Sequence, residues 1–295
     1  IAQCLVGSEM CIRDRNTHRN VKRKINVNNA QCEIDGGFEN STEVIILEAK
    51  NVLHKDFHVR QLYYPYRLWR NKVSKPIRLV FSVYSNMIYR LFEYRFNKLE
   101  DYSSIELIRT KNYSLQDMHI SLEDLMDIRR NTVVTKSDNI SETVIPFIQA
   151  DSVNRLISLL ENMESNPMTA EQIIELMDFV GRQYNYYVSA GIYLGIFERE
   201  LENKTTKLTE IGVSLCRMTY KERQLKLVSL MVEHRIFADF FDYVIDNNGE
   251  LPSKQQVCNK MRELNVCRSE STMERRACSV LSWLKWIFNL PHLAE

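Results

Sequence analysis

The sequence predicts two parts of different fold class, a mixed α/β segment up to about residue 118 and a mostly helical remainder. Two observations support this division. Apolar residues change from short β-branched runs to helical spacing near residue 119, and the charge changes sign along the chain. The length of 295 residues suits about two domains or three small ones, and an apolar fraction of 44% is typical of a globular chain.

The net charge of +1 conceals a basic block followed by an acidic one. Residues 51–98 hold ten Lys and Arg against two acids, and residues 99–178 hold six bases against fifteen acids. The basic block also carries aromatic residues, and basic surface with interspersed rings suits a polyanion such as a nucleic acid. An ordinary solvated face is the alternative interpretation.

Several function classes lack support. No apolar run approaches the ~20 residues needed to cross a bilayer, so no membrane helix is expected. The Cys and His residues lack metal-ligand spacing, and no Cys pair has the C-x-x-C spacing. Neither a disulfide framework nor a zinc site is predicted, and a reducing cytoplasm fits this cysteine usage.

Residues 1–15 stand apart from the rest of the sequence. The run from Cys4 to Arg15 resembles a translated sequencing-adapter artefact, and the segment lacks the features of a secretory signal. We therefore expect the native part of the chain to begin near Asn16, with its true N-terminus missing. A genuine N-terminal strand or helix is the alternative.

The segment 31–109 is predicted to combine short strands with one helix. Strands are expected over QCEIDGGFE, with a break at Gly36–Gly37, and over EVIILEAK, RLVFSVYSN, MIYRLFEYRF and SIELIRT. Between them, DFHVRQLYYPYRLWR predicts a helix over its first turns, which Pro65 must kink or end.

From residue 119 the apolar spacing is helical. SLEDLMDIRR predicts a helix, and the polar stretch Thr135–Ser141 predicts a linker. Three more helical segments precede a two-strand signal across Asn203–Lys204, which is the element order of a winged helix. A second helical run, opening with KERQLKLVSLMVEHRIFADFFDYVIDN, predicts a less complete helix-turn-helix unit. Thr169 and Ser253 are the expected N-caps.

The candidate chemistry lies in CEIDGG followed ten residues later by EAK. Side chains alternate between the faces of a strand, so Glu48 and Lys50 share one face and Ala49 takes the other. Asp35 ends the preceding strand, and pairing of the two strands would bring it beside Glu48. Adjacent carboxylates repel each other, and a hard divalent cation relieves that repulsion. Ordinary ion pairs on a surface hairpin are the alternative.

This pattern resembles the PD-(D/E)XK nuclease superfamily over roughly residues 31–98. Asp35 matches the metal-binding Asp of that superfamily, with Ile34 in the usual position of Pro, and Glu48 and Lys50 match its (D/E)-x-K element. The resemblance implies an α/β restriction-endonuclease-like core, N-terminally truncated, followed by mostly α winged-helix domains.

The helix after the second strand adds to the resemblance, because Gln61 and Tyr64 match the Gln-x-x-Tyr element of part of the superfamily. A helix face packed on the sheet explains these two residues equally well. If the resemblance holds, Gln61 would position Lys50 or the scissile strand. A further acidic residue, which many members carry on an earlier helix, would lie upstream of the present chain.

The resemblance also implies Mg²⁺-dependent hydrolysis of phosphodiester bonds in double-stranded DNA. Asp35, Glu48 and the carbonyl of Ala49 would hold the ion, and Lys50 would orient or deprotonate the attacking water. Glu33 is not expected to be a ligand, because it lies two residues deeper in the strand than Asp35.

The expected domains are a probable artefact at 1–15, a nuclease core at 16–118, a linker and connecting helix at 119–152, a winged helix at 153–220 and a second helix-turn-helix or winged-helix-like domain at 221–295. DNA contacts are expected from helix starts and from the wing, at Arg182, Gln183, Asn185, Lys204, Lys207, Thr272, Arg275 and Arg276. A helical dimerisation or packing module is the alternative for this half.

A nuclease core followed by tandem winged helices is similar to bacterial type II restriction endonucleases. This similarity implies a site-specific endonuclease with a cognate DNA methyltransferase in the same system, and symmetric cutting would favour a homodimer. Two alternatives remain: a non-catalytic winged-helix regulator with a degenerate nuclease fold, and a DNA repair nuclease.

Overall fold

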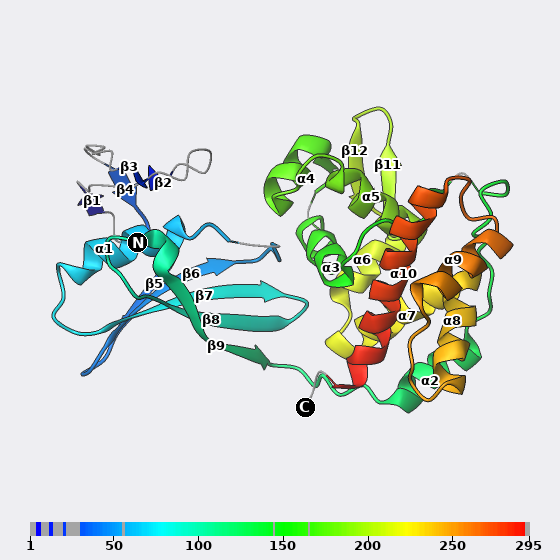
Figure 1. Cartoon of the computed structure of the whole chain (residues 1–295), viewed down its shortest axis with the longest axis horizontal. Helices are drawn as coiled ribbons and strands as arrows, with labels where there is room; N and C mark the ends of the chain where they lie inside the picture. Colours follow the sequence, from blue (N-terminus) through cyan, green and yellow to red (C-terminus); the bar gives the residue numbers. More distant parts are fainter. Residues whose placement is uncertain are drawn as a thin grey trace. The chain divides into compact units, whose positions relative to one another are not determined.

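The computed structural model describes residues 32–54, 57–143, 145–164 and 166–292, together with the backbone of short strands before residue 32. The chain divides into two compact units. The N-terminal unit comprises Ile1–Tyr84 and Ile88–Tyr113, and the C-terminal unit comprises Ser85–Met87 and Ser114–Glu295. The chain therefore passes from one unit to the other three times. Together the units give the mixed α/β content that the sequence predicts (Figure 1).

A five-stranded mixed sheet forms the N-terminal unit, in the order β5-β6-β7-β8-β9. Its strands are β5 (Gly36–Glu39), β6 (Val44–Lys50), β7 (Ile77–Ser85), β8 (Ile88–Phe96) and β9 (Ile105–Ser114). β5 pairs antiparallel with β6, and β6 pairs parallel with β7. The helix α1 (Arg60–Arg70) lies in the connection between β6 and β7. Shorter pieces are η1 (Tyr102–Ser104) and the strand pairs β1 (Cys4–Val6) with β4 (Ala30–Cys32) and β2 (Ile12–Arg13) with β3 (Asn20–Val21).

The core of this unit lies between α1 and one face of the sheet. Leu62 and Tyr63 of the helix pack against Ile46, Leu79 and Phe81 of the strands. Each fully buried side chain of this size contributes about 1.5–3 kcal/mol through removal of apolar surface from water. This packing fixes α1 beside the carboxyl end of β6, where the candidate active site lies.

One of the two outcomes predicted for Pro65, and one strand prediction, are wrong. Pro65 does not end α1, which continues to Arg70, because Pro65 is itself buried and the apolar contacts of Leu62 and Leu68 outweigh one missing backbone hydrogen bond. Gly36 and Gly37 do not break a strand but form the first half of β5, because pairing with β6 outweighs the weak strand propensity of glycine.

The strands predicted over 78–86 and 87–96 are confirmed as β7 and β8, with a two-residue turn between them. Asn86 and Met87 both adopt positive φ, 53° and 59°. Two consecutive residues in this region are the signature of a type I′ turn, which matches the twist of an antiparallel hairpin. β7 and β8 are therefore antiparallel neighbours.

Helices dominate the C-terminal unit (Figure 1). They are α2 (Leu122–Asn131), α3 (Val153–Asn162), α4 (Ala170–Met177), α5 (Gln183–Tyr193), α6 (Glu210–Arg217), α7 (Tyr220–Val232), α8 (Arg235–Asp246), α9 (Lys254–Glu263), α10 (Glu270–Asn289) and the short η2 (Leu290–His292). A small sheet, in the order β10-β12-β11, joins β10 (Met168–Thr169), β11 (Phe197–Glu200) and β12 (Thr205–Leu208).

The predicted order of three helices followed by a hairpin is confirmed over α3, α4, α5 and β11–β12. Thr169 and Ser253 are N-caps, as expected, and each forms a reciprocal capping box with a glutamine three residues later. Gly191 explains the close packing of α5 on the hairpin, because a Cβ there would lie 2.0 Å from the ring of Phe197.

The helical run from residue 221 forms two helices, α7 and α8, separated at Glu233–His234. His234 is extended, with φ −87° and ψ 132°. Asp138 stabilises the break, because its Oδ1 lies 3.0 Å from His234 Nδ1 and its Oδ2 accepts from the Ile236 amide of α8 at 3.1 Å. The helical spacing of apolar residues continues through this break, so the break cannot be predicted from that spacing alone.

Asp138 also changes the interpretation of the polar stretch Thr135–Ser141, which the sequence predicts to be a linker. Its carboxylate is fully buried and accepts from the Tyr193 hydroxyl at 2.6 Å. Lys136 forms a parallel bridge with His234. The stretch is therefore a packed part of the C-terminal unit, and its polar composition reflects hydrogen bonding in the interior.

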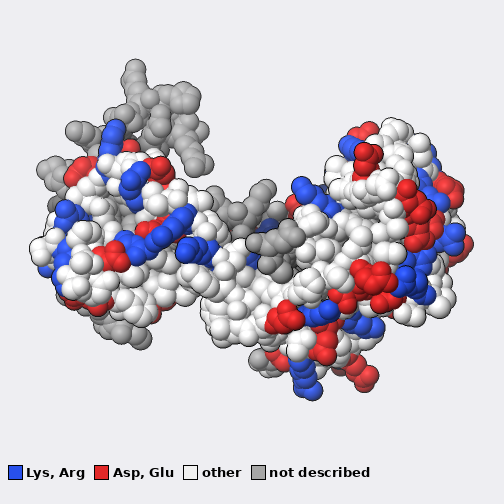
Figure 2. All heavy atoms as spheres, turned by 90° about the horizontal axis from the view of Figure 1, so that it is seen from below, with Lys and Arg blue, Asp and Glu red and all other residues white. Residues whose placement is uncertain are grey.

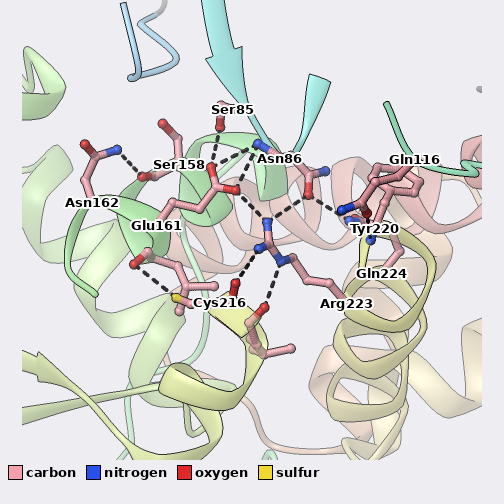
Figure 3. Close-up of polar contacts among 12 residues, drawn as sticks. Ser85, Asn86, Gln116, Ser158, Glu161, Asn162, Cys216, Tyr220, Arg223 and Gln224 are labelled. Atoms are coloured by element: carbon pink, nitrogen blue, oxygen red, sulfur yellow. Dashed lines mark hydrogen bonds and ion pairs between the residues drawn. The ribbon is translucent and has the colours of Figure 1, made fainter. Parts of the chain in front are cut away.

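A second buried polar network surrounds the turn residues Ser85 and Asn86 in the C-terminal unit (Figure 3). Glu161 accepts from the Ser85 hydroxyl at 2.9 Å, from the Asn86 amide at 2.9 and 3.1 Å, and from Arg223 Nη1 at 2.5 Å. Arg223 also donates to the carbonyls of Leu215 and Cys216. Both members of this ion pair therefore have several hydrogen-bond partners.

Among the described residues, no helix has both the length and the apolar character required to cross a membrane.

Candidate active site

The carboxyl end of β6 presents an acid and an amine on one face of the sheet. Val44, Ile46 and Glu48 are buried along this face, whereas Ala49, of opposite parity, is exposed. Glu48 is only 7% exposed, and its Oε1 lies 2.5 Å from Nζ of Lys50. The strand parity predicted from the sequence therefore brings Glu48 and Lys50 into direct contact.

Asp35 joins them from the neighbouring strand. The β5–β6 register pairs Gly36 with Leu47, so Asp35, immediately before β5, lies level with Glu48. Its Oδ2 accepts from the Ala49 amide at 2.8 Å. The Asp35 carboxylate thus accepts from a backbone amide of β6 that would bond to a backbone carbonyl if β5 were longer. This hydrogen bond holds the carboxylate at the edge of β6.

The helix α1 contributes Gln61, whose Nε2 donates to Glu48 Oε1 at 2.8 Å. Gln61 lies in the first turn of α1, which packs on β6, and this position explains the contact. Tyr64, one turn further along, is half-buried with its ring centroid 5.9 Å from that of Tyr63. The structure therefore brings together Asp35, Glu48, Lys50 and Gln61, and Tyr64 belongs to the aromatic packing beside them.

Burial dominates the electrostatics of Glu48. Loss of solvation raises the pKa of its carboxyl group above the usual value, the Lys50 ammonium opposes this shift, and the nearby Asp35 charge adds to it. Both side-chain donors reach Oε1, so Oε2 has no hydrogen-bond donor among the described residues. A buried carboxylate with one free oxygen beside a second carboxylate favours a cation.

The donor set fits a magnesium ion. Among the described residues, no three His, Cys, Asp or Glu side chains gather to hold a metal. Mg²⁺ needs fewer side-chain ligands than three, because it commonly keeps several waters and binds through one or two carboxylates. In a strand, the N–H and C=O of one residue point to the same side, so the Ala49 carbonyl faces the side occupied by Asp35. Asp35, Glu48 and Ala49 therefore supply suitable oxygens.

Basic side chains accompany this site. Figure 2 shows Lys and Arg side chains on the visible face of the N-terminal unit, with several Asp and Glu side chains among them, and the two kinds are also intermixed on the C-terminal unit. Several bases are already engaged: Arg78 pairs with Glu43 and Glu93, and Arg95 pairs with Glu106. On α1, Arg60 and Arg70 are exposed.

The predicted DNA contacts around α5 lie at its N-terminus and on the hairpin. Arg182 and Asn185 are exposed, while the side chain of Gln183 turns back towards the loop before the helix and accepts from the Val180 amide at 2.9 Å. On the hairpin, Lys204 is exposed and has positive φ, and Lys207 lies 3.4 Å from Glu198 and from Glu200. The two glutamates compensate the charge of Lys207, which weakens its attraction for phosphate.

The predicted contacts on α10 differ in exposure. Arg275 is exposed and donates to the Thr272 hydroxyl at 3.4 Å. Arg276 is half-buried, its guanidinium 6.0 Å from the centre of the Phe147 ring, and it lines a cavity. The orientation of Arg276 therefore differs from that expected of a major-groove contact. Helical spacing could have signalled this, because Met273, Ala277 and Val280 share its side of α10.

Sequence reasoning missed one group of functional candidates, the buried Asp138, Tyr193 and His234. The rings of Tyr193 and His234 stack with centroids 3.6 Å apart, and both side chains contact Asp138. These residues come from separate elements with no shared motif. Their only sequence signal is a charged residue in a polar stretch, which is equally typical of a loop.

Comparison with known proteins divides the chain at the same place. Residues 9–114 match a family described as a domain of unknown function (DUF6997), and residues 155–292 match a second one (DUF7226). No curated protein and no solved structure matches the chain. The first match covers the N-terminal unit from residue 9 onward together with Ser85–Met87, and the second lies within the C-terminal unit.

Proposed function

We propose that the protein is a Mg²⁺-dependent endonuclease that hydrolyses phosphodiester bonds in double-stranded DNA. The single observation that carries this proposal is the convergence of Asp35, Glu48 and Lys50 at the carboxyl end of β6. The hairpin, helix and parallel strand that support them, β5–β6, α1 and β7, suit the PD-(D/E)XK core expected from the sequence.

Asp35, Glu48 and the Ala49 carbonyl would hold the ion, which when bound acidifies a coordinated water and neutralises charge on the phosphate. Lys50 would orient the attacking water and donate to a phosphate oxygen, where negative charge develops. Gln61 would keep Glu48 in place, because it binds the same oxygen as Lys50. The burial of Glu48 strengthens each of these electrostatic interactions.

The C-terminal unit would recognise DNA. The order α3, β10, α4, α5, β11, β12 is that of a winged helix, in which the third helix enters the major groove. Arg182 and Asn185 at the start of α5 and Lys204 on the hairpin are exposed and suited to contact bases and phosphates. A restriction enzyme with a cognate methyltransferase is the form of this proposal that the resemblance favours, and symmetric cutting by such an enzyme would favour a homodimer.

The test is cleavage of supercoiled plasmid with Mg²⁺, with EDTA as the control. Glu48→Ala and Lys50→Ala should each lower the cleavage rate at least about a hundredfold while preserving binding in a gel-shift assay. Lys111→Ala serves as the matched control, because Lys111 is an exposed lysine on β9 and its loss should leave cleavage unchanged.

A non-catalytic DNA-binding regulator is the second candidate. The observation that favours it is the group of only two acids at the site, since no third His, Cys, Asp or Glu side chain joins them among the described residues. The two candidates separate in one experiment. Wild-type protein that binds duplex DNA but never cuts it, with either Mg²⁺ or Mn²⁺, excludes the endonuclease and supports the regulator.

A further inference from the structure

A cavity of about 440 Å³ in the C-terminal unit is separate from the candidate active site. Its lining includes residues between Thr135 and Phe147 and Arg276 of α10. The buried rings of Tyr193 and His234 also line it. Its volume lies within the range of about 300–1,000 Å³ that is usual for small-molecule sites.

The acidic groups of the cavity are already satisfied. Asp138 accepts from Tyr193 Oη and the Ile236 amide, and it pairs with His234. The ring nitrogens of His234 lie 3.0 Å from Asp138 Oδ1 and from the Tyr193 carbonyl oxygen. Contacts within the wall therefore engage both oxygens of Asp138.

Glu142, the other acid, is engaged at both oxygens. Oε1 accepts from Asn139 Nδ2 at 3.0 Å, and Oε2 accepts from the Ser137 hydroxyl at 2.5 Å. These contacts orient the carboxylate within its own turn. The acids therefore leave the cations of the cavity without a partner.

Two cations face the cavity without a carboxylate partner among the described residues. Arg276 is half-buried, and its Nε is buried without a hydrogen-bond partner. Lys136 is exposed at the rim and forms no ion pair in the same part of the chain. Partly buried charges are normally paired, because loss of solvation is costly, so an arginine in this state indicates an anionic ligand.

We propose that this cavity binds a small phosphomonoester with an aromatic or apolar body, of about the size of a mononucleotide. The planar guanidinium of Arg276 is suited to two phosphate oxygens, and Lys136 would supply the second positive charge. Ile140, Pro146 and Phe147 offer apolar surface for the body of the ligand. The proposal is independent of the nuclease function, because none of these residues belongs to the site on β6.

The test measures binding to the full chain by calorimetry, with AMP, adenosine, ribose 5-phosphate and inorganic phosphate as probes. AMP should bind most tightly, since it alone offers both the phosphate and the ring. Arg276→Gln should weaken AMP binding about ten- to hundredfold, as expected for the loss of a charge-assisted hydrogen bond. Arg275→Gln, at the exposed neighbouring position, should leave AMP binding unchanged.

Lys136→Gln provides a second variant, because an exposed side chain on the rim is not needed for folding; it should weaken AMP binding less than Arg276→Gln does. Failure of every probe to bind, or equal AMP binding by wild type and Arg276→Gln, would overturn the proposal. Binding of AMP that a duplex oligonucleotide displaces in an Arg276-dependent manner would also overturn it, in favour of a nucleic-acid phosphate as the ligand.

Discussion

Two glutamates, the buried Glu48 of the N-terminal unit and the partly buried Glu161 of the C-terminal unit, have different hydrogen-bond environments. Glu161 receives donors at both oxygens, from Ser85, Asn86 and Arg223 (Figure 3). Glu48 receives both of its donors at one oxygen, and its pKa is raised by burial. The ionised Glu161 therefore stabilises the fold, whereas the ionised Glu48 destabilises it. Groups of the second kind are candidates for chemistry, since perturbed pKa values gather at functional sites.

The largest expected loss of stability follows removal of Arg223, the cation that pairs with Glu161. Arg223→Met leaves Glu161 without its cation, and breaking such a pair costs about 3–5 kcal/mol. The Tm of the C-terminal unit should fall by about 10 °C or more, as measured by circular dichroism. The double variant Arg223→Met with Glu161→Met should recover part of this loss; a double variant that is less stable than Arg223→Met would contradict the comparison.

Loss of the ion-paired Asp124 carboxylate on α2 should have an effect of intermediate size on stability. The Lys221 ammonium 2.8 Å away lowers the pKa of Asp124 to about 2, from an ordinary value of 3.8. A lowered pKa stabilises the fold above pH 3.8, and this contribution is lost as the pH falls towards 2. Asp124→Asn should therefore cost about 2 kcal/mol at neutral pH.

Urea unfolding of wild type and Asp124→Asn at several pH values measures this contribution. The difference between the two proteins should stay nearly constant from pH 7 to about 4 and narrow as the pH falls through 3.8 towards 2. Glu123→Gln is the matched control, because Glu123 is a largely exposed acid on the same helix. A difference that stays constant down to pH 3 would show that the ion pair is not its cause.

The smallest expected effect is a gain in stability rather than a loss. The raised pKa of Glu48 means that its ionised form lowers stability as the pH rises from 4.5 through the folded-state pKa. Glu48→Gln should therefore raise the Tm slightly at neutral pH and leave it unchanged near pH 4. Thermal melts at the two pH values check this, and a lower Tm at pH 7 would place Glu48 in the same class as Glu161.

The sequence predicted local features of the candidate site better than long-range ones. The parity that aligns Glu48 with Lys50 follows from strand geometry, and the approach of Asp35 follows from a short antiparallel connection. Pro65 misled the helix prediction because packing on the sheet outweighs its local cost. The stop at His234 depends on Asp138, almost a hundred residues earlier, and no local pattern carries such information.

The assignment of Ser85–Met87 to the C-terminal unit has a practical consequence for dissecting the protein. A recombinant fragment that starts at Ser114 would contain Glu161, Arg223 and Gln224 but would lack the loop residues that bond to them. Such a fragment would expose unsatisfied polar groups and would be prone to misfold, so its failure would say nothing about the native unit. Point variants in the intact chain are the sounder way to assign roles to the two halves.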